Sequence, residues 1–243
     1  MRKFGLIGKK LGHSFSKIFF DQLFKEQHIS ATFNLIEMDN IAQFEKIKSE
    51  GYVGLSVTLP FKETIIPYLD ELDESAAEIG AVNCVFFKNG KSIGYNTDTV
   101  GFALSLSKIL INRKEIKKAL ILGNGGAAKA VSNVLGKLNI EHKIVSRNPE
   151  SGQIGYTNLD SQTLKEHKLI VNCSPLGMFP NTRTFPDIPY SALDESNILF
   201  DLVYNPAETV FMQRGKEQNA TVCNGLEMLH LQAMAAWNIW NDI

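Results

Sequence analysis

The chain has 243 residues and a formal net charge of -1; 44% of its residues are hydrophobic and 21% are charged. This composition is typical of a globular chain that can bury a core. It lacks the basic excess expected of a protein that binds nucleic acid or an anionic membrane. No segment reaches the ~18 apolar residues of a membrane span, and the amino terminus lacks the apolar stretch of a signal peptide. We therefore expect a soluble cytoplasmic enzyme, and the sequence leaves open whether it is a monomer or a homodimer.

The first hundred residues alternate between strand-like and helix-like patterns. Short apolar or alternating runs predict strands over residues 4–7, 32–38 and 52–58. Apolar residues at helical spacing predict helices over residues 16–27 and 41–49. Strands are also predicted over residues 81–87 and 92–95, because they flank Asn89-Gly90, a strong hairpin signal.

The rest of the chain repeats a strand–helix order. Strands are predicted over residues 118–122, 142–145, 169–172 and 198–201, and helices over residues 99–110, 127–138 and 226–240. This order implies parallel sheets with right-handed crossovers, so the fold class is α/β with two α/β domains. We place the first domain at residues 1–100 and the second at 101–223, with the last helix (224–243) returning to pack on the first.

A glycine-rich turn follows the strand over residues 118–122 and reads Gly123-Asn124-Gly125-Gly126-Ala127-Ala128. In a dinucleotide-binding turn the first glycine permits the bend, the second lets a pyrophosphate approach the backbone, and a small residue keeps the helix near the strand. The free N–H groups of the helix start would hold the phosphates. The alternative is a tight turn in a sheet that binds no cofactor.

The end of the next strand indicates which dinucleotide is bound. It reads Val145-Ser146-Arg147-Asn148, with an arginine where an NAD site would place an acid. A guanidinium suits a 2′-phosphate through bidentate hydrogen bonds, so we expect a Rossmann-like domain that binds NADP(H). The alternative for Arg147 is a solvated side chain at a strand end. The chain between Asn148 and Leu169 is short and polar, so this crossover is expected to lack a full helix.

Two further segments carry candidate chemistry. Ser14 and Ser16 precede the first helix, where two hydroxyls could cradle a carboxylate; the alternative for Ser16 is a helix cap. Lys62 ends an apolar run, and Asp98 stands just before a helical pattern. If they touch, the pair can take the proton of an alcohol as hydride leaves its carbon. The alternative is a surface lysine and a capping aspartate, and the local sequence does not choose between them.

Taken together, the segments resemble shikimate dehydrogenase, over nearly the whole chain. The matching segments are His13–Ser16, Val57–Lys62, Gly80–Cys84, Asn96–Gly101, Gly123–Ala127, Asn172–Met178, Asp201–Thr209 and Asn224–Gln232. No one of these motifs is decisive, but their order along the chain is specific to the family.

The resemblance implies a role for individual residues. Lys62 and Asp98 would form the acid–base pair, and Ser14 and Ser16 would hold the substrate carboxylate. Ring hydroxyls would be bound by Thr58, Asn83, Asp98 and Gln232, with Tyr204 also facing the substrate. The cofactor would contact Gly123, Asn124, Gly125, Gly126, Ala127, Ser146, Arg147, Leu202, Gly225 and Met228. The reaction implied is hydride transfer between NADPH and the ring, which interconverts 3-dehydroshikimate and shikimate; no metal is implied.

Some positions depart from the family pattern. Lys17 replaces a proline, Ser56 an asparagine and Cys84 a threonine. Glu227 stands where the family has a small residue, so the Glu227 carboxylate could crowd the nicotinamide. His230 lies in the same motif. Two other functions stay open: an NAD-using quinate or shikimate dehydrogenase, which Arg147 disfavours, and a non-catalytic NADP-binding regulatory protein, which the intact polar residues disfavour.

Overall fold

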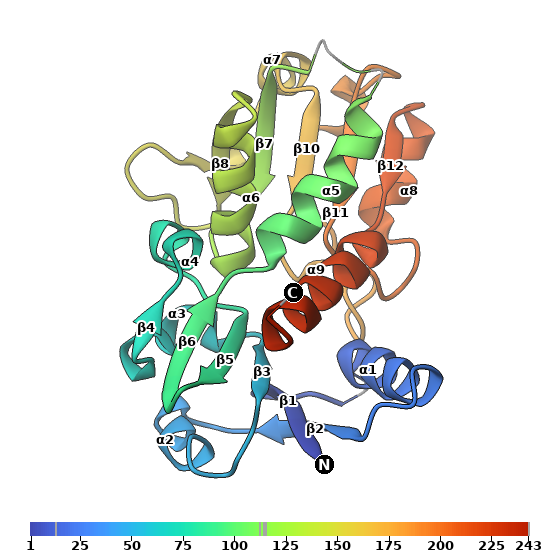
Figure 1. The fold of residues 1–243 in the computed structure, drawn as a ribbon. Coiled ribbons are helices and arrows are strands. Elements are labelled where there is room, and N and C mark those ends of the chain that lie inside the picture. The colour runs from blue at the N-terminus through green and yellow to red at the C-terminus, as the bar shows by residue number, and fades with distance from the viewer. Residues whose placement is uncertain (13, 112, 114–115, 243) are drawn as a thin grey trace. The chain divides into compact units, whose positions relative to one another are not determined.

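The computed structural model describes residues 1–12, 14–111, 113 and 116–242 (Figure 1). It divides into two compact units, the first formed by Met1–Thr97 with Gln232–Ile243 and the second by Asp98–Leu231. The last helix is shared between them, because its residues up to Leu231 belong to the second unit. Each unit has its own six-stranded sheet.

The sheet of the first unit has the strand order β2-β1-β3-β5-β6-β4. Its strands are β1 (Arg2–Gly8), β2 (Ala31–Glu37), β3 (Gly54–Val57), β4 (Glu71–Leu72), β5 (Cys84–Lys88) and β6 (Lys91–Tyr95). β1 is parallel to β2 and β3, whereas β5 is antiparallel to β3 and β6. Asn89 and Gly90 both have positive φ, as a tight turn between β5 and β6 requires.

Apolar side chains cover both faces of this sheet. One face packs on α1 (Phe15–Glu26) and on the end of α9 (Leu226–Trp240), and the other packs on α2 (Phe44–Ile47), α3 (Phe61–Thr64) and α4 (Glu74–Ile79). 3₁₀ turns at Ile41–Gln43 and Ile66–Tyr68 precede α2 and follow α3. The sequence predicted neither α3 nor α4, because helices this short show no clear apolar period.

The end of α9 is fixed in the first unit by aromatic packing and one buried hydrogen bond. The indole of Trp240 stacks on Phe4 and donates from Nε1 to the carbonyl of Val85 at 3.0 Å. Gly54 makes room for this indole, since a Cβ there would lie 2.2 Å from Nε1. The helix predicted over residues 226–240 therefore also contains a specific polar anchor.

Replacing Trp240 with phenylalanine is expected to lower the free energy of unfolding by about 1–3 kcal/mol more than the same change at Trp237. Trp237 packs against the rings of Phe4 and Phe24 and serves as the matched control for lost ring size. Urea unfolding of both variants measures the difference. Equal losses would show that the bond to Val85 adds nothing.

The sheet of the second unit is entirely parallel, with the order β12-β11-β10-β7-β8-β9. Its strands are β7 (Lys118–Leu122), β8 (Glu141–Ser146), β9 (Ile154–Gly155), β10 (Leu169–Asn172), β11 (Ile198–Asp201) and β12 (Thr221–Cys223). Its central strands are buried on both faces, which explains their continuous apolar runs.

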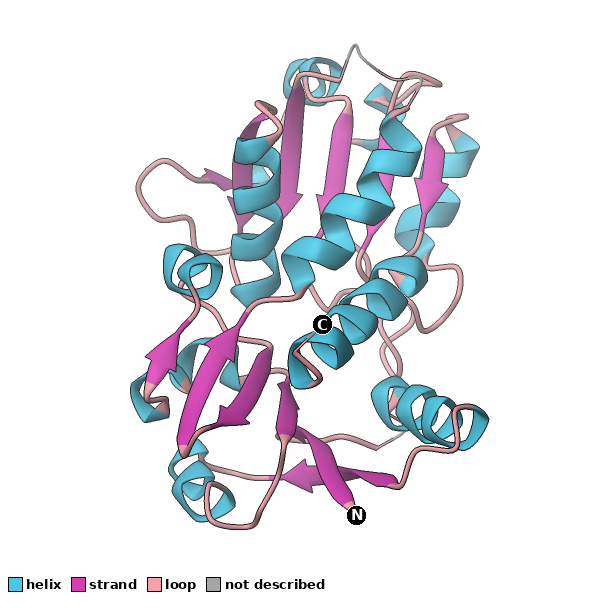
Figure 2. Cartoon of the chain, in the orientation of Figure 1, coloured by secondary structure: helices cyan, strands magenta, loops and turns pink. Residues whose placement is uncertain are grey.

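Alternate residues of these strands form two separate cores. Ala119 and Ile121 of β7 join one core with α5 (Asp98–Leu110) and α6 (Gly126–Lys137). Leu120 and Leu122 join the other with α7 (Ser161–Glu166) and α8 (Val210–Glu217). In Figure 2, α5 and α6 cross in front of this sheet. The sequence predicted neither α8 nor β12.

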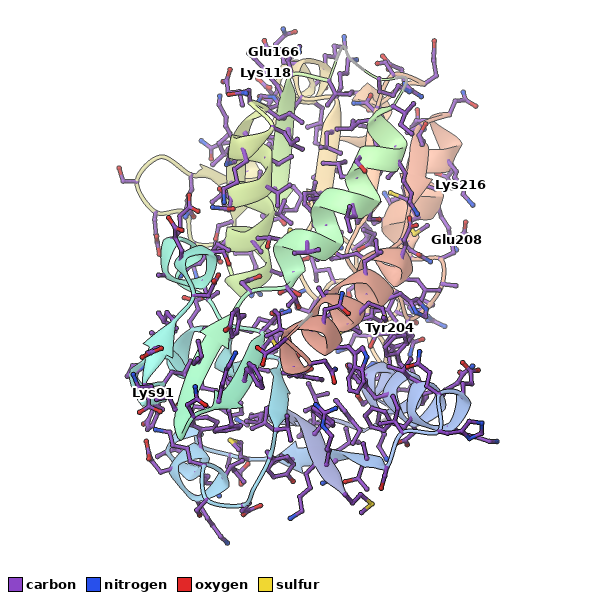
Figure 3. All side chains as sticks on the ribbon, in the orientation of Figure 1. Lys91, Lys118, Glu166, Tyr204, Glu208 and Lys216 are labelled. Atoms are coloured by element: carbon purple, nitrogen blue, oxygen red, sulfur yellow. The ribbon has the colours of Figure 1, made fainter. Side chains whose placement is uncertain are left out.

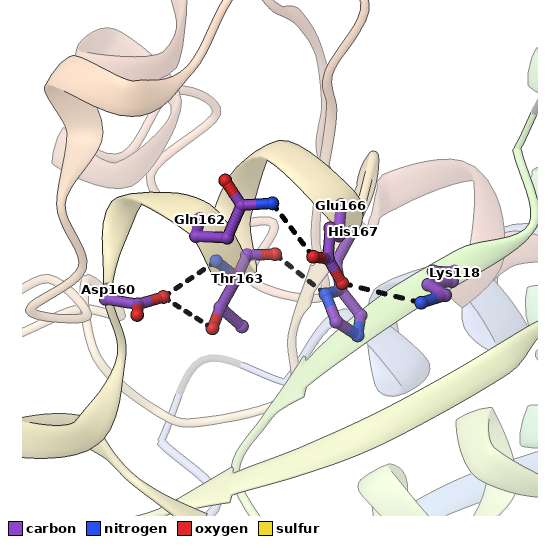
Figure 4. Close-up of polar contacts among 6 residues, drawn as sticks. All are labelled: Lys118, Asp160, Gln162, Thr163, Glu166 and His167. Atoms are coloured by element: carbon purple, nitrogen blue, oxygen red, sulfur yellow. Dashed lines mark hydrogen bonds and ion pairs between the residues drawn. The ribbon is translucent and has the colours of Figure 1, made fainter.

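The crossover between β8 and β10 is as short as the sequence predicted. It contains β9, a 3₁₀ turn (Tyr156–Asn158) and the six-residue helix α7. Asp160 caps α7 by accepting from the Thr163 N–H at 2.7 Å, and Glu166 at its other end pairs with Lys118 of β7 (Figure 4). A full crossover helix is absent from this described segment.

Candidate active site

Ser14 and Ser16 lie at the start of α1. Ser14 is the N-cap, and its Oγ accepts from the Lys17 N–H at 3.4 Å. The suggestion that Ser16 caps the helix is therefore wrong; Ser16 is the second helical residue, because the extended residue before Phe15 is Ser14. Both hydroxyls nonetheless belong to one helix start. His13 of the same motif lies outside the described residues.

The departure at Lys17 is accommodated within the first unit. The Lys17 ammonium donates to the Asp21 carboxylate at 2.7 Å and to the Phe33 carbonyl at 3.0 Å. The side chain thus joins α1 to β2.

Thr58 and Lys62 are held by backbone hydrogen bonds at the end of β3. The Thr58 N–H donates to the Ile7 carbonyl at 2.9 Å. Lys62 is the second residue of α3, and its carbonyl accepts from the Val82 N–H at 2.7 Å. Since Asn83 follows Val82, the backbone of Lys62 is fixed next to another predicted substrate residue.

Asn83, Thr97 and Gln232 form a polar network. Asn83 Oδ1 accepts from the Thr97 N–H at 2.7 Å, and Asn83 Nδ2 donates to Thr97 Oγ1 at 2.9 Å and Gln232 Oε1 at 3.3 Å. Because a backbone N–H can only donate, these contacts fix which way the Asn83 amide points. Gln232 comes from α9, so residues far apart in the sequence meet here.

Thr97 is the residue of this network that sequence reasoning passed over. It is 1% exposed and uses both its N–H and its hydroxyl. Its place between Asn96 and Asp98, in a motif already singled out, was the signal that could have found it.

Asp98 is the first residue of α5 and is 6% exposed. It is a helical residue, not the extended residue before the helix that the capping alternative described. Lys62 belongs to the first unit and Asp98 to the second.

The glycine turn lies between β7 and α6, as predicted. Gly123 has a φ of 116° and its N–H donates to the Val145 carbonyl, so the bend needs a residue without a side chain. Gly125 is the N-cap of α6, and a Cβ there would meet open space. The helix start therefore presents backbone N–H groups and the positive end of its dipole without an obstructing side chain, which suits a phosphate.

Ser146 and Arg147 end β8. Ser146 is buried, and its Oγ lies 3.3 Å from both the N and the O of Asn148, so a local turn carries the exposed Arg147 beyond the strand. Burial raises the pKa of nearby Tyr156 to about 12, and the positive charge of Arg147 opposes that rise. These residues could hold a 2′-phosphate.

Asp201 is the centre of a buried network at the carboxyl ends of β10 and β11. Its Oδ1 accepts from Asn172 Nδ2 at 2.9 Å and from the Val203 N–H at 3.0 Å, and its Oδ2 accepts from Thr209 Oγ1 at 2.6 Å. Burial raises its pKa to about 6, and these three hydrogen bonds counteract part of that rise. Sequence reasoning matched this motif without assigning Asp201 a role.

Replacing Asp201 with asparagine is expected to change how stability depends on pH. The folded state binds the Asp201 proton more tightly than the unfolded chain, since the pKa rises from 3.8 to about 6. Ionisation therefore costs stability as the pH rises, and asparagine has no such cost. The unfolding free energy of the variant minus that of the wild type should rise by about 2 kcal/mol between about pH 4.5 and about pH 7.5. Urea unfolding across this range measures it; a difference independent of pH would contradict it.

Leu202 and Tyr204 directly follow the end of β11, whereas Gly225 and Met228 lie around the start of α9. The Leu202 N–H donates to the Asn172 carbonyl at 3.0 Å, and a Cβ on Gly225 would lie 2.2 Å from the Leu202 oxygen. Burial raises the pKa of Tyr204, which Figure 3 labels in the segment after β11. Met228 is buried in the core under α5 and α6.

Glu227 pairs within the second unit. Its carboxylate accepts from Lys108 of α5, and Ser105 Oγ lies 3.5 Å from it. Glu227 and His230 line an open hollow with Asn224, Leu226 and Leu231. This ion pair directs the Glu227 carboxylate, which the family pattern does not have, towards α5.

Comparison with known proteins identifies relatives over the full length. The family model "Shikimate dehydrogenase substrate binding domain" matches residues 6–85. A shikimate dehydrogenase (NADP(+)) of Methanococcus maripaludis is 38% identical, over 97% of this chain and 90% of its own. A crystal structure of a shikimate dehydrogenase in complex with NADP+ has a TM-score of 0.88 and 33% identity, and covers 100% of this chain and 90% of its own.

A second structure carries both ligands. It is the Thermus thermophilus shikimate 5-dehydrogenase in complex with NADP(H) and shikimate, with a TM-score of 0.87, 26% identity, and coverage of 100% of this chain and 94% of its own. Among the described residues, none of the helices is long and apolar enough to cross a membrane. Sequence identity, coverage and fold agree: the chain belongs to the shikimate dehydrogenase family.

Proposed function

We propose that this chain is an NADP-dependent shikimate dehydrogenase, which reduces 3-dehydroshikimate to shikimate reversibly in the biosynthesis of chorismate and aromatic amino acids. The observation that carries the proposal is the polar network of Asn83, Thr97 and Gln232. A polyhydroxylated ring needs amide groups whose donors and acceptors are fixed in place, because a mismatched hydroxyl would leave buried partners unpaired. The relatives named shikimate dehydrogenase support the same substrate.

The proposed substrate-binding domain is the first unit. Ser14 and Ser16 are assigned to the carboxylate, since both hydroxyls stand at one helix start. Thr58, Asn83 and Gln232 are assigned to ring hydroxyls. Asp98 and Tyr204, which belong to the second unit, are also assigned to the substrate.

The proposed NADP-binding domain is the second unit. The start of α6, residues Gly123–Ala127, fits a pyrophosphate because a Cβ on Gly125 would meet none of the described atoms within 4 Å. Ser146 and Arg147 are assigned to the 2′-phosphate. Leu202, Gly225 and Met228 are assigned to the nicotinamide end, where Gly225 lets α9 begin directly against the Leu202 carbonyl.

Lys62 and Asp98 are the proposed acid–base pair. When bound, NADPH supplies the hydride. The chain's own task is to hold a proton next to the substrate oxygen and to move it, and a coupled ammonium and carboxylate do this without a metal. The location in the cytoplasm and a monomeric or homodimeric state complete the proposal; the three unbridged cysteines support a reducing compartment.

The test mixes purified protein with shikimate and NADP⁺ and follows the absorbance of the NADPH that forms. We expect turnover, with a higher kcat/KM for NADP⁺ than for NAD⁺. Turnover that is faster with NAD⁺ and quinate would favour a quinate dehydrogenase instead. Binding of NADPH without turnover of either ring acid would favour a regulatory protein.

A further inference from the structure

In the hydrogen bonds around Asp201, the neighbouring groups donate and the Asp201 carboxylate accepts. Thr209 Oγ1 accepts from the Met212 N–H at 3.3 Å, as the cap of α8, so its own hydrogen points to Asp201 Oδ2. Asn172 Oδ1 accepts from both the N–H and the hydroxyl of Ser174, so the Asn172 amide must donate to Asp201. A carboxylate, which only accepts, is the group that satisfies all of these donors at once.

This network fixes the backbone that leaves β11. Oδ1 of Asp201 holds the Val203 N–H, and the carbonyl of Asn172 holds the Leu202 N–H at 3.0 Å. The carbonyl of Val203 in turn accepts from the Gly225 N–H at 3.2 Å. The segment 202–204 is therefore held on one side by buried side chains and on the other by the start of α9.

We propose that Asp201 is a positioning residue for hydride transfer, because its carboxylate holds the segment 202–204 in a fixed position relative to Gly225. The inference rests on the proposed function, which assigns Leu202 and Gly225 to the nicotinamide and Tyr204 to the substrate. The phosphates have their own binding groups at the start of α6 and at Arg147. The network should therefore govern how the nicotinamide is aligned, not how tightly the whole cofactor binds.

The experiment compares Asp201→Ala with Asp201→Asn, and Thr209→Val with Thr209→Ser. The first of each pair removes the polar contact, and the second keeps a polar group that can still form a hydrogen bond. Shikimate turnover gives kcat, and titration with NADPH gives its affinity and the emission of its bound nicotinamide. All variants are assayed at a temperature where circular dichroism shows them folded.

Asp160→Ala is the matched control. It removes the cap of α7 in the same unit, as Thr209→Val removes the cap of α8, but it does not touch the segment 202–204. We expect it to lower the melting temperature and to leave kcat unchanged.

Asp201→Ala and Thr209→Val should lower kcat about 10- to 100-fold and shift the nicotinamide emission, with NADPH affinity changed less than about threefold. Thr209→Ser should restore most of kcat. Unchanged kcat, or equal losses of kcat and NADPH affinity, would overturn the inference. If the wild type itself turns over no ring acid, the proposed function fails. The binding data then test the inference alone: a shift in nicotinamide emission at unchanged NADPH affinity supports a positioning role for Asp201, and no shift contradicts it.

Discussion

Replacing Lys62 with alanine is expected to lower kcat for shikimate oxidation by about 10²- to 10⁴-fold, with a much smaller change in shikimate binding. The side chain is proposed to move a proton in the transition state, whereas the serines and amides of the first unit are proposed to bind the ground state. An interaction made only in the transition state lowers kcat when it is lost. Steady-state kinetics and a shikimate titration in the presence of NADPH measure the two effects separately.

Lys91→Ala is the control for this prediction. Lys91, labelled in Figure 3, belongs to the same unit and pairs with Glu71 at the surface. Its loss removes an equal charge without touching the proposed site. Its kinetic constants should match those of the wild type. A Lys62→Ala variant with weakened binding and normal kcat would contradict the catalytic role and leave Lys62 a binding residue.

Replacing Arg147 with glutamate is expected to lower kcat/KM for NADP⁺ by about 10²- to 10³-fold, while the value for NAD⁺ changes far less. The variant would lose the proposed charge-assisted hydrogen bonds to the 2′-phosphate, each worth about 1.5–3 kcal/mol, and would add a repelling carboxylate. NAD⁺ has a 2′-hydroxyl at this position, so neither effect applies to it. The ratio of the two kcat/KM values is the measurement.

Lys165→Glu makes the same change of charge elsewhere in the second unit. Lys165 is exposed in the last turn of α7. Its substitution should leave the cofactor ratio unchanged, since the whole-protein field is screened over a distance of about 8–10 Å in ordinary buffers. A ratio that moves equally in both variants, or in neither, would remove Arg147 from the cofactor site.

The parts of the fold with strong local patterns were predicted correctly. The strands β7, β10 and β11 match the predicted ranges because buried parallel strands consist of continuous apolar residues. The hairpin of β5 and β6 was predicted because Asn89-Gly90 tolerates positive φ. In contrast, α3, α4 and α8 have four to eight residues, too few for a helical period to stand out, and tertiary packing stabilises them.

The proposed site divides in the same way. The position of the glycine turn could be predicted, and a role for Arg147 could be proposed, because a single local segment carries each motif. The partners of Glu227 could not, because Lys108 lies more than one hundred residues earlier in the chain and meets it only through the packing of α5 against α9. This pairing bears on the cofactor site, because the Glu227 carboxylate, which departs from the family pattern, pairs with the ammonium of Lys108 in its own unit.

The sequence by itself determined the α/β class, the family and the residue types that the chemistry needs, since these follow from local apolar periods and from short motifs in a fixed order. Only the tertiary structure decided how polar groups distant in sequence are paired: Asn83 with Gln232, Asp201 with Asn172, and Trp240 with Val85. The physical reason is that a hydrogen bond between buried side chains depends on which strands and helices pack together. No local propensity encodes that packing.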